Sequence, residues 1–275
     1  MKKRNWIAYP HMVWMAIFVL IPVLIVLLYS IASISNNGIE FTLKYFERVF
    51  EPTNLLVFWR SIKIAAISTA FCLILGYPLA LILASRNLSK RNMLIVLVVV
   101  PMWMNFLART YAWMTILDNK GLIASLFHSL GLPPLNIMYT DAAVVLGMVY
   151  NFLPFMILPI YSVLSKTNKS VIEASQDLGA TPFVTFKRVT LPLSVPGIVS
   201  GITMVFMPAV TTFVISALLG GGQYMLIGNL IQQQFLSSSD WNFGSALSIF
   251  LMVLIMLSMA IMSRYEKDNE GGGLW

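Results

Sequence analysis

The stretch SVIEASQDLGATPFVTFKRVTLPLSVPG, residues 170–197, carries the signals of a structured loop and leads directly into a long apolar run. Ser170 is followed three residues later by Glu173, a spacing that predicts a capping box at the start of a short helix. Gly179 can supply the left-handed turn that ends this helix. The first part of the stretch therefore predicts a short helix with a defined start and end.

The second part of the stretch predicts another short helix. Thr181 can cap it, with Pro182 at its first helical position. The helix is expected to end before Leu191-Pro192, because a residue that precedes proline is biased away from helical backbone. We expect the loop over residues 165–194 to present two capped helices as a docking surface.

Apolar runs on both sides of this loop predict a membrane protein with six helices. A bilayer core about 30 Å thick needs about 20 mostly apolar residues per helix. Runs of that length occur at residues 11–33, 61–84, 93–115, 142–164, 195–219 and 243–263. The fold class expected is all-α, in one transmembrane domain that covers residues 1–275.

Composition excludes the other broad classes. The 275 residues are 58% hydrophobic and 11% charged, with a mean hydropathy of +0.81. A soluble enzyme, a secreted domain or a disordered adaptor would need far more polar surface. The single Cys72 rules out a disulfide framework within the chain. Although the net charge is +7, basic residues beside apolar spans are better explained by membrane orientation than by nucleic-acid binding.

Charge also predicts which side of the membrane each loop occupies. If the N-terminus is cytoplasmic, the cytoplasmic segments hold twelve of the eighteen basic residues. By the positive-inside rule, both termini and residues 165–194 are then cytoplasmic.

Several kinds of chemistry lack the residues they need. The six runs contain no Asp or Glu, which argues against an ion-coupled carrier. No Gly-Lys pair exists for a Walker A loop, and no H-E-x-x-H pair exists for a metal site, so no catalytic or metal residue is assigned. Energy must come from another subunit. Of the two basic residues in the spans, Lys63 and Arg109, we expect Arg109 to face a partner helix or to snorkel outward.

The loop resembles the EAA loop of binding-protein-dependent ABC importer permeases. The family pattern reads E-A-A-x3-G-x9-I-x-L-P, and here Ser175 replaces the second alanine and Val189 the isoleucine. The resemblance implies a type I ABC importer permease (MetI-like) fold, in which a coupling helix at about residues 170–180 lies in a cleft of an ATPase subunit. We call residues 165–194 the coupling loop. The residues that the resemblance assigns to ATPase coupling are Glu173, Ala174, Asp177, Gly179, Ala180, Leu191 and Pro192.

Three more stretches resemble the PotB-type permeases of spermidine/putrescine importers. They are STAFCLILGYPLA (68–80), PMWMNFLARTYAW (101–113), and 218–248, which begins LLGGGQYMLIGN. The resemblance covers nearly the whole chain from about residue 10. It implies a PotC-type partner permease, two PotA-type ATPase subunits that hold ATP and Mg, and a PotD-type external receptor. It also implies that the ATPase cycle drives alternating access.

A polyamine path could be lined by aromatic ring faces, which attract ammonium groups through cation–π contacts worth about 0.5 to 2 kcal/mol. The path candidates are Trp103, Asn105, Tyr111, Trp113, Asp141 and Asp240. For the aromatic residues among them, the alternative is an aromatic belt at the membrane interface. For the two aspartates, which are expected on the external side, the alternative is helix capping or simple solvation.

These observations predict the permease subunit of an ATP-driven importer that is not itself an enzyme and holds no cofactor. Two alternatives stay open. The first is the same machine with another substrate, such as ferric iron, thiamine or an opine. The second is a channel or secondary carrier that works without ATP, although the docking loop and the absence of intramembrane acids count against it.

Overall fold

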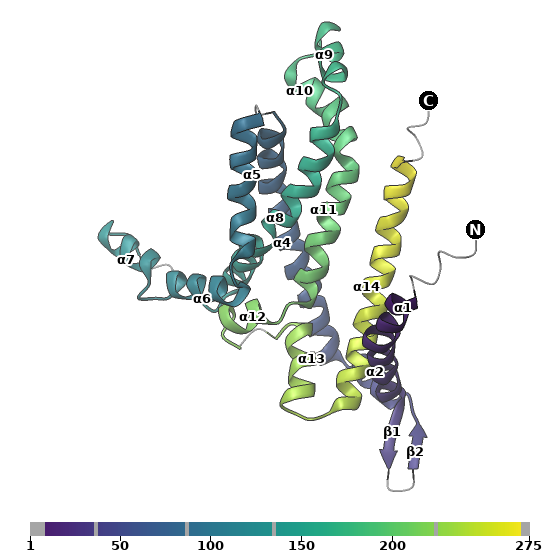
Figure 1. Ribbon diagram of the computed structural model, residues 1–275. Helices are drawn as coiled ribbons and strands as arrows, with labels where there is room; N and C mark the ends of the chain where they lie inside the picture. Colours follow the sequence, from purple (N-terminus) through teal and green to yellow (C-terminus); the bar gives the residue numbers. More distant parts are fainter. Residues whose placement is uncertain (1–8, 36–37, 86–87, 134–135, 223–224, 271–275) are drawn as a thin grey trace, which may run out of the picture. The chain divides into compact units, whose positions relative to one another are not determined.

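The computed structural model describes residues 9–35, 38–85, 88–133, 136–222 and 225–270, which are mainly helical (Figure 1). The chain divides into two compact units. Unit 1 comprises residues 1–58 and 230–257, and unit 2 comprises residues 59–229 and 258–275. Each unit is described by itself, and the expectation of a single domain over residues 1–275 stays a prediction.

The first apolar run forms the start of unit 1. It is helical from Tyr9 to Ile31, two residues earlier than the predicted run at each end, with a π-helical turn in its middle. The helix stops where Ala32 adopts extended backbone and begins a two-stranded antiparallel hairpin in which Ala32 lies opposite Phe41. The elements are α1 (Tyr9–Met15), η2 (Ala16–Leu20), α2 (Ile21–Ile31), β1 (Ala32–Ser35) and β2 (Gly38–Phe41).

The hairpin is followed by α3 (Lys44–Val49), and α14 (Trp241–Glu270) supplies the last span. Asn242, near the start of α14, donates side-chain hydrogen bonds to the backbone carbonyls of Tyr29 (2.9 Å) and Ala32. These bonds satisfy carbonyls at the end of α2 that have no partner within the helix. The sixth span is thereby tied to the end of the first within unit 1.

Unit 2 is built around α8 (Asp141–Lys166) and α11 (Leu191–Thr211), which run side by side (Figure 1). Their closest approach uses Gly197 and Gly201, four residues apart in the small-xxx-small pattern of packed membrane helices. A Cβ atom on Gly197 would lie 3.0 Å from the Ile160 Cα, and one on Gly201 would lie 2.7 Å from the Met156 Sδ. The long helix α4 (Pro52–Ser85) adds Gly76 against Met156.

The third predicted span, 93–115, is not one straight helix. It is divided into α5 (Leu88–Trp103) and α6 (Phe106–Leu117), which α7 (Leu122–Ser129) follows. The chain bends by 92° at the break. Asn105 causes the new start, because its side-chain oxygen accepts hydrogen bonds from the backbone N–H groups of Leu107 (2.8 Å) and Ala108 (3.2 Å).

The fifth predicted span, 195–219, is also shorter than expected. Its helix ends at Thr211 and is followed by α12 (Val214–Leu219) and then α13 (Ile227–Leu236). Asn229 stabilises the break, because its side-chain amide donates to the Phe213 carbonyl (2.9 Å) and its side-chain oxygen accepts from the Ser216 hydroxyl (2.5 Å). These partners are 13 and 16 residues from Asn229, so no local sequence signal predicts the break.

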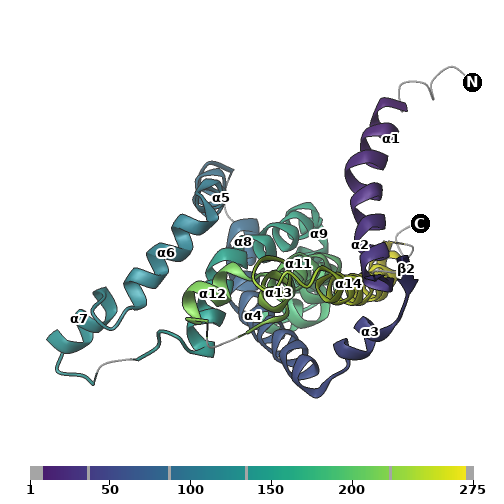
Figure 2. The same ribbon diagram turned by 90° about the horizontal axis from the view of Figure 1, so that it is seen from below.

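Among the described residues, five helices are long and apolar enough to cross a membrane, and the bent pair would make a sixth if it counts as one span. The five helical stretches are Tyr9–Ile31, Pro52–Ser85, Asp141–Lys166, Pro182–Thr211 and Trp241–Met262. Within unit 2, α6 packs against α8 and α12, and the view from below shows α7 extending beyond them, so that α6 and α7 form an arm (Figure 2).

Candidate functional site

The coupling loop occupies one end of the α8–α11 pair, and α6 and α12 lie at the opposite end (Figure 1). It consists of α9 (Lys169–Asp177), α10 (Pro182–Thr185) and a π-helical turn, η3 (Phe186–Thr190). The two short helices predicted from residues 170–197 are therefore present. Their ends differ from the prediction in two respects.

The start of α9 is one such difference, because Asn168 caps the helix and the predicted capping box is wrong. The Asn168 side-chain oxygen accepts a hydrogen bond from the Ser170 N–H (3.1 Å), so Ser170 lies inside the first turn. Asparagine is among the best N-cap residues, and here it comes two residues before the predicted serine. This leaves Glu173 as an exposed carboxylate on the second turn of α9.

The end of α9 follows the prediction. Gly179 has a φ of +80°, in the left-handed region that favours glycine. The Gly179 N–H donates to the Gln176 carbonyl (2.8 Å), and the Ala180 N–H donates to the Ser175 carbonyl (3.2 Å). These two bonds form a Schellman motif. No atom lies within 4 Å of a Cβ atom built on Gly179, so backbone strain alone, and not crowding within the chain, makes a side chain costly there.

A hydroxyl pair holds α9 to α10. The Ser175 and Thr185 hydroxyls are 3.0 Å apart, and Thr185 is buried. Ser175 stands where the resembled family has its second alanine, so the departure from the pattern adds a contact. Thr181 caps α10 as predicted, because its hydroxyl accepts from the Val184 N–H (3.4 Å). The hydroxyl pair thus adds a direct contact between the two short helices.

The predicted end of the second helix before Leu191-Pro192 is wrong. The helix continues from Pro182 through η3 into α11, up to Thr211. Pro192 lies in the first turn of α11, and the Leu191 N–H donates to the Phe186 carbonyl five residues earlier. The π-helical turn thus accommodates a proline that lacks the usual hydrogen bond. The coupling loop is therefore joined rigidly to α11.

Tyr77 of α4 links the coupling loop to a second span. Its ring packs edge-on against Phe186 of η3, with centroids 5.9 Å apart. Its hydroxyl lies 2.8 Å from the Ser194 hydroxyl on α11, and both residues are buried. Tyr77, Phe186 and Ser194 were not among the residues predicted to act in coupling. The sequence around Tyr77 is an apolar run with no distinguishing signal, and the residues that Tyr77 contacts lie more than 100 residues away.

The tip of the coupling loop exposes large apolar side chains. Leu178 is 88% exposed and Phe183 is 72% exposed. Ala174, Asp177 and Ala180 surround them on α9 and its turn, and apart from Ala180 they are exposed. An exposed apolar cluster among polar residues is typical of a protein-binding surface. Behind it, Glu173 lines a pocket of about 410 Å³ between α9 and the ends of α4 and α8.

The aromatic path candidates differ in their surroundings. Trp103 is 82% exposed at the end of α5, and Tyr111 is 53% exposed on α6. Trp113 packs edge-on against Tyr150 of α8, with centroids 5.2 Å apart. Asn105 caps α6, so its side-chain oxygen is already used. Their place in a solute path stays a prediction.

Both aspartate candidates are paired with arginines. In unit 2, Asp141 at the start of α8 accepts from Arg60 (2.9 Å). In unit 1, Asp240 accepts from Arg48 (2.9 Å) and also from the Phe243 N–H (3.1 Å), so it caps α14. Arg48 lies 4.0 Å above the Phe243 ring in a cation–π contact. Each carboxylate therefore has a structural role, which agrees with the capping alternative for Asp240.

Arg109 does not snorkel to the surface. It is only 8% exposed on the inner face of α6, beside the buried Thr110. Its buried Nε and Nη1 atoms have no hydrogen-bond partner among the described residues. Within the same part of the chain, no group of three or more His, Cys, Asp or Glu side chains is arranged to hold a metal ion.

The comparisons with known proteins agree on one kind of transporter. The family described as "Binding-protein-dependent transport system inner membrane component" matches residues 76–269. The spermidine/putrescine transport system permease protein PotB of Haemophilus influenzae is 40% identical over 261 residues, which cover 92% of this chain and 91% of that protein. PotB of Escherichia coli K12 is 39% identical over 259 residues, which cover 92% and 94%.

Solved structures give the same architecture. A chain of a bacterial ABC transporter involved in the import of the acidic polysaccharide alginate matches with a TM-score of 0.81. The match covers 97% of this chain and 96% of that chain at 17% identity. A second structure, of an alginate transporter in complex with a periplasmic protein, matches with a TM-score of 0.79 at 18% identity. At such low identity the likeness shows the fold alone.

Proposed function

Because the chain belongs to the family of binding-protein-dependent transport system inner membrane components, we propose that it is the permease subunit of an ATP-driven importer of spermidine and putrescine. Family membership and the solved structures confirm the predicted fold class, an all-α permease of the type I ABC importers. The observation that carries the substrate is the 39–40% identity to two PotB proteins, which covers more than nine-tenths of each chain.

The proposed complex contains a PotC-type permease, two PotA-type ATPase subunits and a PotD-type receptor. ATP and Mg bind to the ATPase subunits, and this chain catalyses no reaction. The exposed Leu178 and Phe183 at the tip of the coupling loop support docking to an ATPase, because large apolar side chains at a protein tip favour burial against a partner. The proposed location is the inner (plasma) membrane of a bacterial cell, with the coupling loop and both termini on the cytoplasmic side, which the distribution of basic residues supports.

The contacts around the coupling loop support a path by which movement of the ATPase subunits reaches the membrane helices. The Ser175–Thr185 hydroxyl pair and the turn at Gly179 keep α9 and α10 together. Helical continuity through η3 passes a displacement directly to α11. The Tyr77 ring on Phe186 passes the same displacement to α4. Closure of the ATPase dimer would thereby move two spans at once.

The solute path is proposed to be lined mainly by ring faces and carbonyl groups. Trp103 and Tyr111 keep more than half of their surface exposed and are free to meet an ammonium group. Asp141 and Asp240 are less suited to receive one, because each is already neutralised by an arginine. The absence of Asp and Glu from the predicted spans is consistent with transport that needs no coupling ion.

The test is uptake of labelled spermidine and putrescine by cells that lack this chain. Cells are rescued with the wild type, with Gly179→Asp, or with Gly222→Asp as a matched control. Gly222 has a similar φ (+71°) and equally open surroundings, but it lies in the loop after α12, at the other end of unit 2. We expect rescue by the wild type and Gly222→Asp only.

The remaining outcomes separate the alternatives. Uptake by Gly179→Asp equal to the wild type would contradict the coupling role. An intact complex that carries neither amine would contradict the substrate, and ferric iron, thiamine and an opine would then be tried. Uptake that persists when ATP is depleted would favour a channel or a secondary carrier.

A further inference from the structure

The bend at Asn105 turns α6 and α7 out of the direction of α5. The 16 residues of α5 rise by about 24 Å, most of a bilayer core about 30 Å thick. After the 92° turn the chain runs across the direction of α5 (Figures 1 and 2). A helix that turns at the end of a crossing segment lies along the membrane surface. The arm lies at the end of unit 2 opposite the coupling loop (Figure 1), so with the coupling loop in the cytoplasm, as in the proposed function, the arm lies in the external leaflet.

One face of α7 is suited to lipid chains. Leu122, Leu126 and Leu130 recur every four residues and are 73%, 59% and 65% exposed. Residues at this spacing form one stripe on a helix. A short helix with an exposed leucine stripe and a polar opposite side is typical of segments that lie in the bilayer interface.

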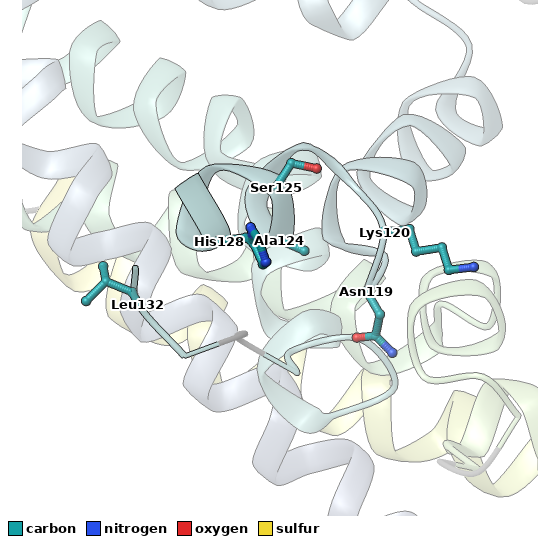
Figure 3. Close-up of a pocket in the computed structure, with 6 residues that line it drawn as sticks. All are labelled: Asn119, Lys120, Ala124, Ser125, His128 and Leu132. Carbon is teal, nitrogen blue, oxygen red and sulfur yellow. The ribbon is translucent and has the colours of Figure 1, made fainter. Parts of the chain in front are cut away.

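The polar side of the same helix lines a pocket of about 420 Å³. Ser125 and His128 come from α7, and Lys120 comes from the connection before it (Figure 3). Asn119, Ala124 and Leu132 complete the lining. Neither Lys120 nor His128 has a polar partner among the described residues, and the Ser125 hydroxyl donates to the Gly121 carbonyl (3.0 Å).

An ammonium group, an imidazole and an amide therefore line the pocket, and the exposed Lys120 side chain, which extends away from His128 in Figure 3, turns toward a ligand that also meets His128. The nearest acid in sequence, Asp118, is partly satisfied because its side-chain oxygen accepts from the Asn119 N–H (2.7 Å). Such a set of donors fits a phosphate group. A free phosphate would leave the leucine stripe exposed, whereas a phospholipid matches both sides of α7.

We propose that this pocket binds the phosphate of an anionic phospholipid, while Leu122, Leu126 and Leu130 enter the acyl layer. The lipid anchors the arm and holds the broken third span at a fixed depth. This role goes beyond the proposed function. It depends on the chain crossing a membrane and is independent of the solute that is carried.

The test uses the complex purified with its partner subunits, in nanodiscs of phosphatidylethanolamine and phosphatidylglycerol. Native mass spectrometry after release into detergent counts the phosphatidylglycerol that the complex retains. Lys120→Ala should lower the affinity about fivefold, and adding His128→Ala should lower it further. Lys44→Ala is the matched control, because it removes an exposed lysine of α3 outside the pocket, and it should retain lipid as the wild type does.

A second measurement does not depend on the pocket variants. A nitroxide on Leu126→Cys reports its depth through its accessibility to oxygen and to a water-soluble nickel complex. The label can be selective because Cys72 is buried. We expect a depth just below the headgroups, and a label in bulk water would overturn the proposal.

Two competing occupants give different results. Inorganic phosphate that displaces the lipid from the complex at millimolar concentration would show a general phosphate site, and would overturn the lipid assignment. If Lys120→Ala weakens receptor binding while lipid retention stays at the wild-type value, the surface is a receptor contact and the proposal is wrong.

Discussion

The turns and caps within the coupling loop use contacts of short sequence separation, whereas its link to α4 through Tyr77 and the ion pair at the opposite end of unit 2 are both long-range. In the coupling loop, the Asn168 cap acts on Ser170, the Gly179 turn on Ser175 and Gln176, and the hydroxyl pair joins residues ten apart. At the opposite end, Arg60 pairs with Asp141, 81 residues away. Local contacts follow from local sequence, and distant ones need the fold first.

The difference also explains how the ends behave as partner surfaces. The tip of the coupling loop exposes the apolar side chains of Leu178 and Phe183, which a partner protein can bury. Asp141 in unit 2 and Asp240 in unit 1, which were predicted to be external, are already paired with arginines. A solute or receptor arriving there meets carboxylates that an arginine occupies. Four predictions test this comparison, from the largest expected effect to the smallest.

Gly201→Leu should have the largest effect, because it separates the helix pair that joins the two ends. A Cβ atom there would lie 2.7 Å from the Met156 Sδ and 3.2 Å from the Met156 carbonyl oxygen. Overpacking of this kind costs about 1–3 kcal/mol, and more where backbone must move. The thermal midpoint of the solubilised complex measures it. Val199→Leu, two residues earlier on the same helix, is the control, and an equal midpoint for both variants would contradict close packing at Gly201.

Gly179→Ala should weaken the turn of the coupling loop by about 1–2 kcal/mol, because alanine resists a φ of +80°. No clash adds to this cost. We expect ATP-driven uptake to fall, with normal amounts of assembled complex in the membrane. Comparison with Gly179→Asp separates strain from charge. If alanine is harmless and only aspartate blocks uptake, the charge at the ATPase contact, and not the turn, is what matters.

Asp240→Ala should destabilise the protein more than Asp141→Ala. Asp240 caps α14 in addition to its ion pair, and loss of a cap costs about 0.5–2 kcal/mol. Thr140 caps α8, so Asp141→Ala loses only a partly exposed ion pair worth about 0.2–1 kcal/mol. Thermal midpoints rank the two. A loss of amine uptake in Asp141→Ala at unchanged stability would instead show that Asp141 meets the solute.

The Ser175–Thr185 pair should show the smallest effect. A double-mutant cycle of Ser175→Ala and Thr185→Val should give a coupling energy of about 1 kcal/mol in stability. Both variants keep the side chains close to their original size. A coupling energy near zero would mean that α9 and α10 are held together by the turn alone.

Much of the coupling loop could be predicted from sequence. Gly179 and Thr181 act on backbone groups within a few residues, so their spacing alone carries the signal. The prediction at Ser170 was wrong because Asn168, two residues earlier, is also a good N-cap residue and is the one that caps α9. The role of Tyr77 could not be predicted, because an aromatic residue in an apolar run looks like any other until its partners are known.

The sequence by itself determined that the chain is built from apolar helices suited to a membrane and where its loop turns, because hydropathy and caps act over short distances. Only the structure decided that the third predicted span breaks at Asn105, that α10 runs on into α11, and that two aspartates are paired with arginines. The ion pairs depend on groups that meet only after the helices have packed, whereas the Asn105 cap and the π-helical turn are local features that an apolar pattern alone does not reveal.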